Sequence, residues 1–598
     1  MLMKLALSGM KQRRRDYLVL FSGLIFSIAI FYMFETIATN KAFIESTSSV
    51  SILPVIFHLG SILLAIITLV YIIYANSFLL SLREREFGMY MMLGAKKSKI
   101  RQIMFGETLV IGLISIVSGI VVGAGLSAGV SQLLMRALDF QSKSFQFIHV
   151  PSIIMTAGFF AILFLLSSLF NAGKLSKTKL IQLLKGEKQV EIKQANKKRN
   201  WGLFVLALVL LFAGYLVLYK VGAGKMTLNG IVIALVTIPV GTYLVYATVV
   251  PKVIASLRNR KTALEHGLTV FTYGQIEFRM NHYARMLAVV TMLLALALGS
   301  VTVGLGFKNN AVNITSTSTY YDIGLQNPNE QELKLLDNAN SKSIQKTVYH
   351  FKEQDKVIYF LKNEMIAHAP EKFDQRKKLQ LDPESLETGK LSENWEWAIR
   401  GLFPYDLDAA VKVVGAQQFS TINAPQQIIM AVRSADYRAD MPMWNKLRKI
   451  EIKKLGIANT LYFDRYYAVK LLDELAKGTE FMGFFLGVSF LAMMASTLMF
   501  KILTGATADI KRYEMLRKIG AQRSVMVKAI AKENLFLFGL PALFGLIHVA
   551  FGLQMFKALL DQPYYRFWVP VLLLAIIYSI YYLITVWMYK SIVLGKKE

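Results

Sequence analysis

The stretch FGMYMMLGAKKSKI, residues 87–100, has a second copy at residues 513–526, which read YEMLRKIGAQRSVM. A glycine-alanine pair lies in the middle of both copies, and a glutamate follows each copy at the same distance, Glu107 and Glu533. Glycine readily takes the positive φ that ends a helix. The sequence therefore predicts two equivalent helical hairpins, each with one helix that stops near the glycine and another that starts after it.

Long apolar runs surround both hairpins. Hydrophobic residues make up 54% of the 598 residues, and a helix needs roughly 20 apolar residues to cross a bilayer. Runs without Asp, Glu, Lys or Arg occupy residues 17–34, 46–82, 108–135, 144–173, 200–219, 226–251, 286–307, 481–500, 534–556 and 567–589. We therefore predict a membrane protein with ten transmembrane helices.

Basic residues orient the predicted spans. They cluster before span 1, between spans 2 and 3, after span 4, before span 7 and before span 9, whereas the alternate loops hold few charges. Because cytoplasmic loops carry the excess of Lys and Arg, we expect a bacterial cell-membrane protein with both chain ends and both hairpins in the cytoplasm. Residues 308–480 are then extracellular.

The net charge of +29 raises the question of a nucleic-acid partner. The segment from Lys308 to Lys477 is nearly balanced, with 24 basic and 22 acidic residues, so the excess lies beside the spans. That distribution follows the orientation of the helices and not a nucleic-acid-binding domain. We expect no nucleic acid among the partners.

The polar segment 308–480 has the pattern of a folded α+β domain. A helix is predicted at 329–339, and a further helix at 466–478 leads almost directly into span 8 as a stalk. Stretches rich in Val and Ile predict strands at 356–361, 410–415 and 426–432. The chain has no cysteine, so disulfides, zinc-thiolate sites and thiol nucleophiles are excluded.

A second, fainter match pairs QRRRDY (12–17) with FRMNHY (278–283) and indicates two related halves. The expected fold is an all-α polytopic membrane protein with two pseudo-repeated four-helix halves, a two-helix bridge and an α+β extracellular domain between helices 7 and 8. The expected segments are an N-terminal flank with span 1 (1–50), a first core with spans 2–4 and an interfacial helix at 174–186 (51–186), the bridge (187–262), a juxtamembrane segment with span 7 (263–307), the extracellular domain (308–480) and a second core with spans 8–10 (481–598).

Each hairpin is expected to present apolar residues inside a charged rim, the first through Phe87, Met91 and Leu93. Such a surface suits docking against another protein. A hairpin that lies on the membrane and meets anionic headgroups would show the same pattern. The presence of two copies favours a partner with two-fold symmetry.

The segment REREFGMYMMLGAKKSKIRQIMFGETLVIG (83–112) is similar to the hallmark segment of FtsX/MacB-type ABC transporter permeases. Ten spans with a large external domain between spans 7 and 8 resemble the BceB-like subfamily, the bacitracin and antimicrobial-peptide resistance permeases of Gram-positive bacteria. The resemblance implies a permease subunit without catalytic residues, metal site or cofactor of its own, because ATP and Mg would bind a separate ATPase.

The resemblance also implies that the hairpins dock the ATPase, in two copies. In the second hairpin Arg517 and Lys518 replace Met91 and Met92 of the first, so the two surfaces are expected to differ in strength. The implied docking residues are Glu86, Phe87, Met89, Leu93, Gly94 and Ala95 in the first hairpin and Tyr513, Glu514, Met515, Ile519, Gly520 and Ala521 in the second.

The implied function is removal or export of peptide antibiotics that act on lipid-linked cell-wall precursors. A sensor histidine kinase is the second implied partner, and the peptide or its lipid pyrophosphate target is the implied ligand. Two alternatives from other classes stay open: an FtsX-like regulator that transmits movement to cell-wall hydrolases, and a permease that extracts lipids or lipoproteins.

Membrane lipids are a further expected partner. Basic residues near the external ends of the spans could contact lipid headgroups, although long basic side chains also extend to the interface without a specific ligand. These residues are Arg136, Lys143, Lys220, Lys225, Lys308, Lys557 and Arg566.

Overall fold

The computed structural model describes residues 14–40, 53–137, 146–177, 197–226, 228–259, 269–339, 344–374, 377–381, 386, 392–403, 410–456, 464–560 and 562–595. The chain divides into two compact units. The helical unit comprises Met1–Ile44, Leu53–Gly306 and Gly478–Glu598, and the described residues of the sheet unit lie within Phe307–Lys477.

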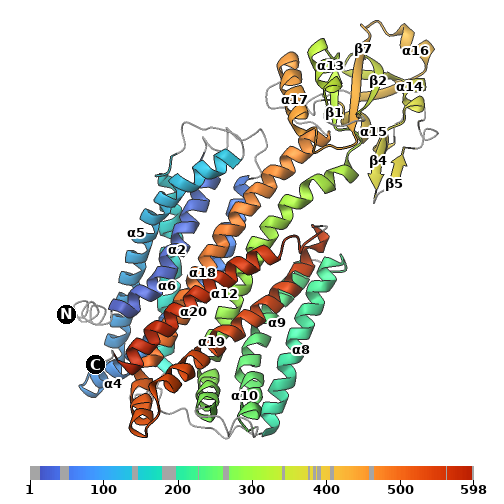
Figure 1. Cartoon of the computed structure of the whole chain (residues 1–598). Helices are drawn as coiled ribbons and strands as arrows, with labels where there is room; N and C mark the ends of the chain where they lie inside the picture. Colours follow the sequence, from blue (N-terminus) through green and yellow to red (C-terminus); the bar gives the residue numbers. More distant parts are fainter. Residues whose placement is uncertain are drawn as a thin grey trace. The chain divides into compact units, whose positions relative to one another are not determined.

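Ten helices in the described part of the chain are long and apolar enough to cross a membrane. This number confirms the predicted one, and the chain is a multi-pass membrane protein. Helices suit this environment because each satisfies its own backbone N–H and C=O groups where no water is available. The helices that contain these spans are α2 (Arg14–Thr39), α4 (Leu53–Met92), α5 (Lys97–Ala137), α6 (Val150–Lys177), α8 (Lys197–Gly222), α9 (Leu228–Leu244) with the π-helix Val245–Val249 and α10 (Val250–Arg258), α12 (Thr269–Ser318), α18 (Arg465–Lys518), α19 (Arg523–Gly552) with the 3₁₀-helix Leu553–Ala558, and α20 (Trp568–Leu594) (Figure 1).

Four of these helices are much longer than one crossing requires: α4, α5, α12 and α18. Helix α4 has 40 residues and α18 has 54, which correspond to about 60 Å and about 80 Å, against a hydrocarbon core of about 30 Å. Helices α4 and α18 each end at one of the two predicted hairpins, and both hairpins lie at the lower end of the helical unit in Figure 1. The predicted helix at 466–478 is confirmed as the start of α18, which continues without a break into span 8.

Glycines bring the third helix of each predicted half against the first. A Cβ on Gly119 of α5 would lie 2.6 Å from Ile28 of α2, and a Cβ on Gly545 of α19 would lie 2.5 Å from Leu294 of α12. Gly119 and Gly545 are separated by the spacing that relates Gly94 to Gly520, and Ile28 and Leu294 by the spacing of the second match. The two contacts fall at equivalent positions of the predicted halves, and the arrangement as two related halves stays a prediction.

The sheet unit contains a five-stranded sheet with the order β1-β7-β2-β3-β6. All pairs are antiparallel except β3 with β6. The strands are β1 (Ile323–Gln326), β2 (Ile344–Gln354), β3 (Val357–Leu361), β6 (Ala410–Val414) and β7 (Gln427–Ser434), with a separate hairpin of β4 (Glu371–Asp374) and β5 (Lys377–Gln380). The helices are α13 (Glu330–Asp337), α14 (Lys362–Ala367), α15 (Glu393–Arg400), α16 (Ala416–Thr421) and α17 (Met441–Leu455). The three predicted strands and the helix predicted at 329–339 are confirmed as β3, β6, β7 and α13.

Both faces of this sheet are buried. Along β7, Ile429 and Ala431 belong to a core that contains Trp395, whereas Met430 and Val432 belong to a second core around Trp444. Successive side chains of a strand point to opposite faces, so a strand covered on both sides must be apolar throughout. This explains why β7 reads as a continuous apolar run and was recognisable from the sequence.

A substitution in β1 tests the packing of the sheet unit. A Cβ on Gly324 would lie 2.5 Å from the backbone oxygen of Leu402, so Gly324→Ala forces the backbone to shift. We expect a loss of about 1–3 kcal/mol in the stability of this unit, measured by tryptophan fluorescence during thermal unfolding. A Cβ on Gly415 meets no atom within 4 Å. An equal loss in Gly415→Ala would contradict this account.

Candidate functional site

The two hairpin turns have the same backbone geometry. The amide of Ala95 donates to Tyr90 O at 2.9 Å and the amide of Gly94 to Met91 O at 3.1 Å, which is the Schellman pattern of a helix end. The second hairpin repeats both bonds at equivalent positions, Ala521 to Leu516 O at 3.0 Å and Gly520 to Arg517 O at 3.0 Å. The φ angles of Gly94 and Gly520 are +92° and +93°. The predicted helix stops are therefore confirmed at both glycines.

The interior of each hairpin contains an aromatic residue that the sequence interpretation placed on the surface. Phe87 is 1% exposed and packs with Ile100, Ile103 and Met104 between the two helices of the first hairpin. Tyr513 occupies the equivalent position and is 2% exposed. The expectation that the first hairpin presents Phe87 is therefore wrong, because the side chain faces the partner helix. Phe87 and Tyr513 support the surface from within.

The tips of both hairpins expose aliphatic side chains to solvent. Leu93 is 86% exposed and Ile519 is 80% exposed, with Met89 and Met515 beside them at 51% and 61%. Glu514, Gly94 and Gly520 are also exposed, whereas Glu86, Ala95 and Ala521 are half-buried. Basic residues surround both tips, with Lys96 and Lys99 in the first and Lys518 and Arg523 in the second. An apolar centre with a charged rim is the composition of a protein-binding surface.

A buried ion pair holds the base of the first hairpin together. Arg83 Nη1 of α4 donates to Glu107 Oε2 of α5, and both side chains are less than a tenth exposed. Arg83 Nε also donates to Glu86 Oε2 at 3.0 Å, and its guanidinium lies 4.9 Å from the centre of the Phe87 ring. Arg83 and both of these carboxylates belong to α4 and α5, so the ion pair joins the two helices of the hairpin itself.

The second hairpin has the opposite charge at the equivalent position. Asp509 replaces Arg83, while Glu533 matches Glu107, so two carboxylates meet where the first hairpin has a pair. The buried cation comes from another helix: Arg279 Nη2 of α12 donates to Asp509 Oδ2 at 2.6 Å and lies 3.2 Å from Glu533 Oε2. Arg512 of α18 donates to Asp509 Oδ1 at 3.0 Å, but its side chain is 41% exposed. The side chains of Arg279, Asp509 and Glu533 are 5%, 7% and 0% exposed.

Tyrosines complete this cluster. Tyr589 of α20 donates to Asp509 Oδ2 at 2.6 Å and accepts a bond from Arg279, while Tyr513 donates to Glu533 Oε1 at 3.1 Å. Burial raises the pKa of the Tyr513 phenol, and the neighbouring Glu533 raises it further. Tyr513 therefore keeps its proton and stays a donor. The cluster connects the second hairpin to α12 and α20, whereas the Arg83–Glu107 pair joins the two helices of the first hairpin to each other.

This charge cluster is not among the site residues predicted from the sequence. Arg279 and Glu533 each belonged to a repeat match, but only the fold brings them together. The sequence does contain one signal of the cluster, which is the reversal of charge between Arg83 and Asp509 at equivalent positions. Asp509 and Glu533 are then two buried carboxylates, and they require a cation from another part of the chain.

The candidate lipid-contact residues are dispersed. Arg136, Lys220, Lys225, Lys557 and Arg566 are exposed, as an interfacial basic residue would be. Lys143, the side chain of Lys308 and most of the predicted interfacial helix at 174–186 lie outside the described residues. Contact with lipid headgroups stays a prediction. In the described part of the chain, no group of three or more His, Asp or Glu side chains could hold a metal ion.

Comparison with known proteins places this geometry in a family. The family model described as FtsX-like permease C-terminal matches residues 58–180, which include the whole first hairpin and its Arg83–Glu107 pair. The chain contains an FtsX-like permease domain. It is also similar over nearly its whole length to two proteins named bacitracin export permease protein BceB. The protein from Bacillus subtilis (strain 168) is 22% identical, with 99% of each chain covered, and the protein from Halalkalibacterium halodurans is 22% identical, with 98% of this chain and 99% of the relative covered.

A third relative has a broader name. The ABC transporter permease protein YxdM of Bacillus subtilis is 22% identical over 92% of this chain and 93% of its own length. The chain is therefore similar to permeases of the BceB type over nearly its whole length, and the predicted resemblance is confirmed. The alignments cover the sheet unit as well as the spans, so the likeness extends beyond the matched domain.

Proposed function

We propose that this BceB-like permease is the membrane subunit of an ABC transporter whose ATPase subunits dock on the two hairpins. The observation that carries the proposal is the pair of equivalent tips, each with one aliphatic side chain at least 80% exposed on a Schellman turn. A solitary exposed leucine needs no explanation. Two at matching positions on rigid turns suit a partner that is itself present twice.

The buried ion pairs support a mechanical role for the hairpins. A surface that only rests on lipid does not require a stiff base, whereas a lever does. Arg83–Glu107 stiffens the first hairpin, and Arg279 connects the second to α12. ATP binding and hydrolysis on the partners would then move α4 and α18, whose length beyond a bilayer supplies the lever arm. The cytoplasmic position of both hairpins is part of this proposal and rests on the distribution of basic residues.

The proposed substrate class comes from the relatives. Two of them are named bacitracin export permeases, and we propose that this chain removes or exports peptide antibiotics that act on lipid-linked cell-wall precursors. A sensor histidine kinase that uses the permease to detect the peptide belongs to the same proposal.

Deletion of the gene tests the proposed substrate class. We expect lower tolerance to bacitracin or to lantibiotics in the deletion strain, restored by the intact chain but not by a chain co-expressed with an ATPase that cannot hydrolyse ATP. Tolerance is measured as the minimal inhibitory concentration. Unchanged tolerance together with chained or filamentous cells would instead assign the chain to the regulators of cell-wall hydrolases.

A further inference from the structure

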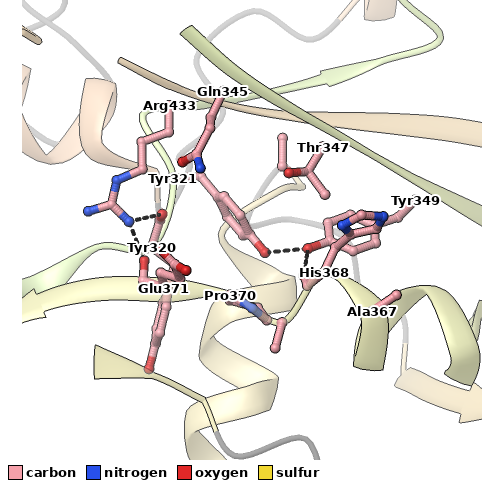
Figure 2. A pocket seen from close by; sticks show the side chains of 12 residues that line it. Tyr320, Tyr321, Gln345, Thr347, Tyr349, Ala367, His368, Pro370, Glu371 and Arg433 are labelled. Atoms are coloured by element: carbon pink, nitrogen blue, oxygen red, sulfur yellow. Dashed lines mark hydrogen bonds between the residues drawn. The ribbon is translucent and has the colours of Figure 1, made fainter. Parts of the chain in front are cut away.

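A pocket of about 160 Å³ opens in the sheet unit, beside the residues that follow α12 (Figure 2). One wall is a single face of two paired strands, where Gln345 and Thr347 of β2 lie opposite Arg433 and Ala431 of β7. The other walls are the residues after α12 and the segment between α14 and β4. The volume holds roughly five water molecules at liquid density, which suits one small ring and excludes a folded peptide.

Two phenols form the floor of this pocket. Tyr349 donates its hydroxyl proton to the backbone oxygen of His368 at 2.5 Å, so the 3.1 Å bond between the phenols has Tyr321 as donor (Figure 2). Burial raises the pKa of Tyr349 to about 12 and raises the pKa of Tyr321 well above its usual value. Both phenols therefore stay neutral, and the Tyr321 oxygen keeps lone pairs that can accept a hydrogen bond.

The charges around the pocket cancel. Arg433 Nη1 donates to the backbone oxygens of Tyr320 and Glu371, which makes this arginine a brace between two walls (Figure 2). Burial lowers the pKa of Arg433, and the nearby carboxylates Asp322 and Glu371 oppose this effect, whereas the second cation, Arg465, adds to it. Arg433 and Glu371 thus place one cation and one carboxylate in the lining, and Arg465 pairs with Asp322 at 3.1 Å behind it. Neither an anion nor a cation would gain a net attraction here.

The groups at the mouth are also neutral and can both donate and accept. Gln345 is exposed and carries an amide, and Thr347 is half-buried and carries a hydroxyl. Together with Tyr321 and Tyr349 they give four uncharged hydrogen-bonding side chains around one small space. A site built to bond hydroxyl groups rejects analogues that lack them, because its own polar groups would be left unpaired.

We propose that this pocket binds one neutral, polyhydroxylated ring, that is, a single sugar residue. Each ring hydroxyl both donates and accepts, which matches Thr347, Gln345 and the Tyr321 oxygen without requiring a charge. A carboxylate or phosphate would have to compete with two carboxylates. An ammonium group would have to compete with Arg433 and Arg465. The proposal concerns the sheet unit alone and does not rest on ATPase docking.

The floor of the pocket is fixed to the first turn of α18. The amide of Arg465 donates to Tyr321 O at 3.0 Å and the amide of Tyr466 to Asp322 O at 3.0 Å, while Arg465 Nη1 donates to Asp322 Oδ1 at 3.1 Å. A ring that bonds Tyr321 therefore restrains the segment from which α18 begins. The first turn of α18 would therefore be held more firmly when the pocket is occupied than when it is empty.

Ligand-observed NMR on the whole chain in lipid nanodiscs tests the proposal. Nanodiscs are required because maltoside and glucoside detergents contain sugar rings themselves and would compete with the sugar probes. The probes are glucose and N-acetylglucosamine, with N-acetylalanine amide as the peptide-like comparison and methyl phosphate as the anion, since each of these carries carbon-bound protons. We expect saturation transfer to the two sugars only. Each of Thr347→Val and Gln345→Ala should weaken sugar binding about fivefold, the value of one hydrogen bond.

A matched phenol serves as the control. Tyr321→Phe should also weaken sugar binding about fivefold, whereas Tyr437→Phe should not, since Tyr437 is a buried tyrosine of the same unit whose hydroxyl has no hydrogen-bond partner. Thermal unfolding of each variant separates loss of binding from loss of fold. The proposal would be overturned by the absence of a sugar signal, or by a stronger signal from N-acetylalanine amide or methyl phosphate. It would also be overturned if Thr347→Val and Gln345→Ala both bound sugar as tightly as the unchanged chain.

Discussion

Replacement of Leu93 and Ile519 by aspartate in the same chain is expected to abolish the stimulation of a partner ATPase. Both side chains project from their turns, at 86% and 80% exposure, and they are the most exposed aliphatic groups of the two hairpins. Loss of such an anchor from the centre of an interface costs about 2 kcal/mol or more, which is roughly thirtyfold in affinity for each hairpin. The measurement is the ATPase rate of the reconstituted complex and retention of the ATPase during purification.

The fold should survive this double change. Exposed side chains away from buried networks contribute within about 0.5 kcal/mol to stability, so thermal unfolding of the purified permease should be unchanged. Leu93→Met with Ile519→Met keeps the apolar character and is the matched control. Normal stimulation of the ATPase by the aspartate variant would show that the ATPase docks elsewhere on the permease. The variant Phe87→Asp cannot replace this test, because Phe87 is buried and its loss would damage the hairpin itself.

The hairpins were predictable because their signal is local. A glycine after a helix, a charged second helix and a repeat at constant spacing can all be read without knowing what packs where. Even so, periodicity alone did not place Phe87. An apolar residue on a hairpin can face the partner helix or the solvent, and the contacts with Ile100 and Met104 decide this only once α5 is in place.

The sheet unit shows where a local signal fails. The longest strand, β2, reads IQKTVYHFKEQ and interrupts its apolar residues with Lys346, His350 and Lys352. The turn into β3 is equally inconspicuous: Asp355 and Lys356 have φ of 52° and 59°, although two-residue hairpin turns of this type favour Asn-Gly or Asp-Gly. Pairing with β7 holds β2 in the sheet, and that pairing is long-range.

The charge cluster of the second hairpin is also long-range. Arg279 and Asp509 lie on different helices, with the whole sheet unit between them in the sequence. The sequence shows that both residues lie near the ends of apolar runs. Many other charged residues lie at such ends too, so this position alone does not pair Arg279 with Asp509. What it cannot show is that Asp509, the counterpart of Arg83, finds its cation on α12.

Substitution of Arg279 is the prediction with the largest effect on stability. Arg279→Met removes the cation that lies within 3.2 Å of both Asp509 and Glu533, whose side chains are 7% and 0% exposed. Breaking a buried pair by removal of one partner costs about 3–5 kcal/mol. We expect a lower midpoint of thermal unfolding for the purified permease. Arg279→Lys should recover part of it, since an ammonium group is a point charge and lacks the planar fork that reaches three partners.

The two carboxylates should not contribute equally to this loss. Asp509 keeps a bond from Arg512 Nη1 at 3.0 Å when Arg279 is absent, and it also keeps the Tyr589 hydroxyl. Glu533 keeps only the Tyr513 hydroxyl, and its Oε2 has no hydrogen-bond partner even in the intact cluster. In the Arg279→Met background, Glu533→Gln should therefore restore more stability than Asp509→Asn, because it removes the charge with the poorest compensation. If Asp509→Asn instead restored more stability than Glu533→Gln, Asp509 and not Glu533 would be the carboxylate for which α12 supplies the cation. The second hairpin would then be held to α12 through α18 alone.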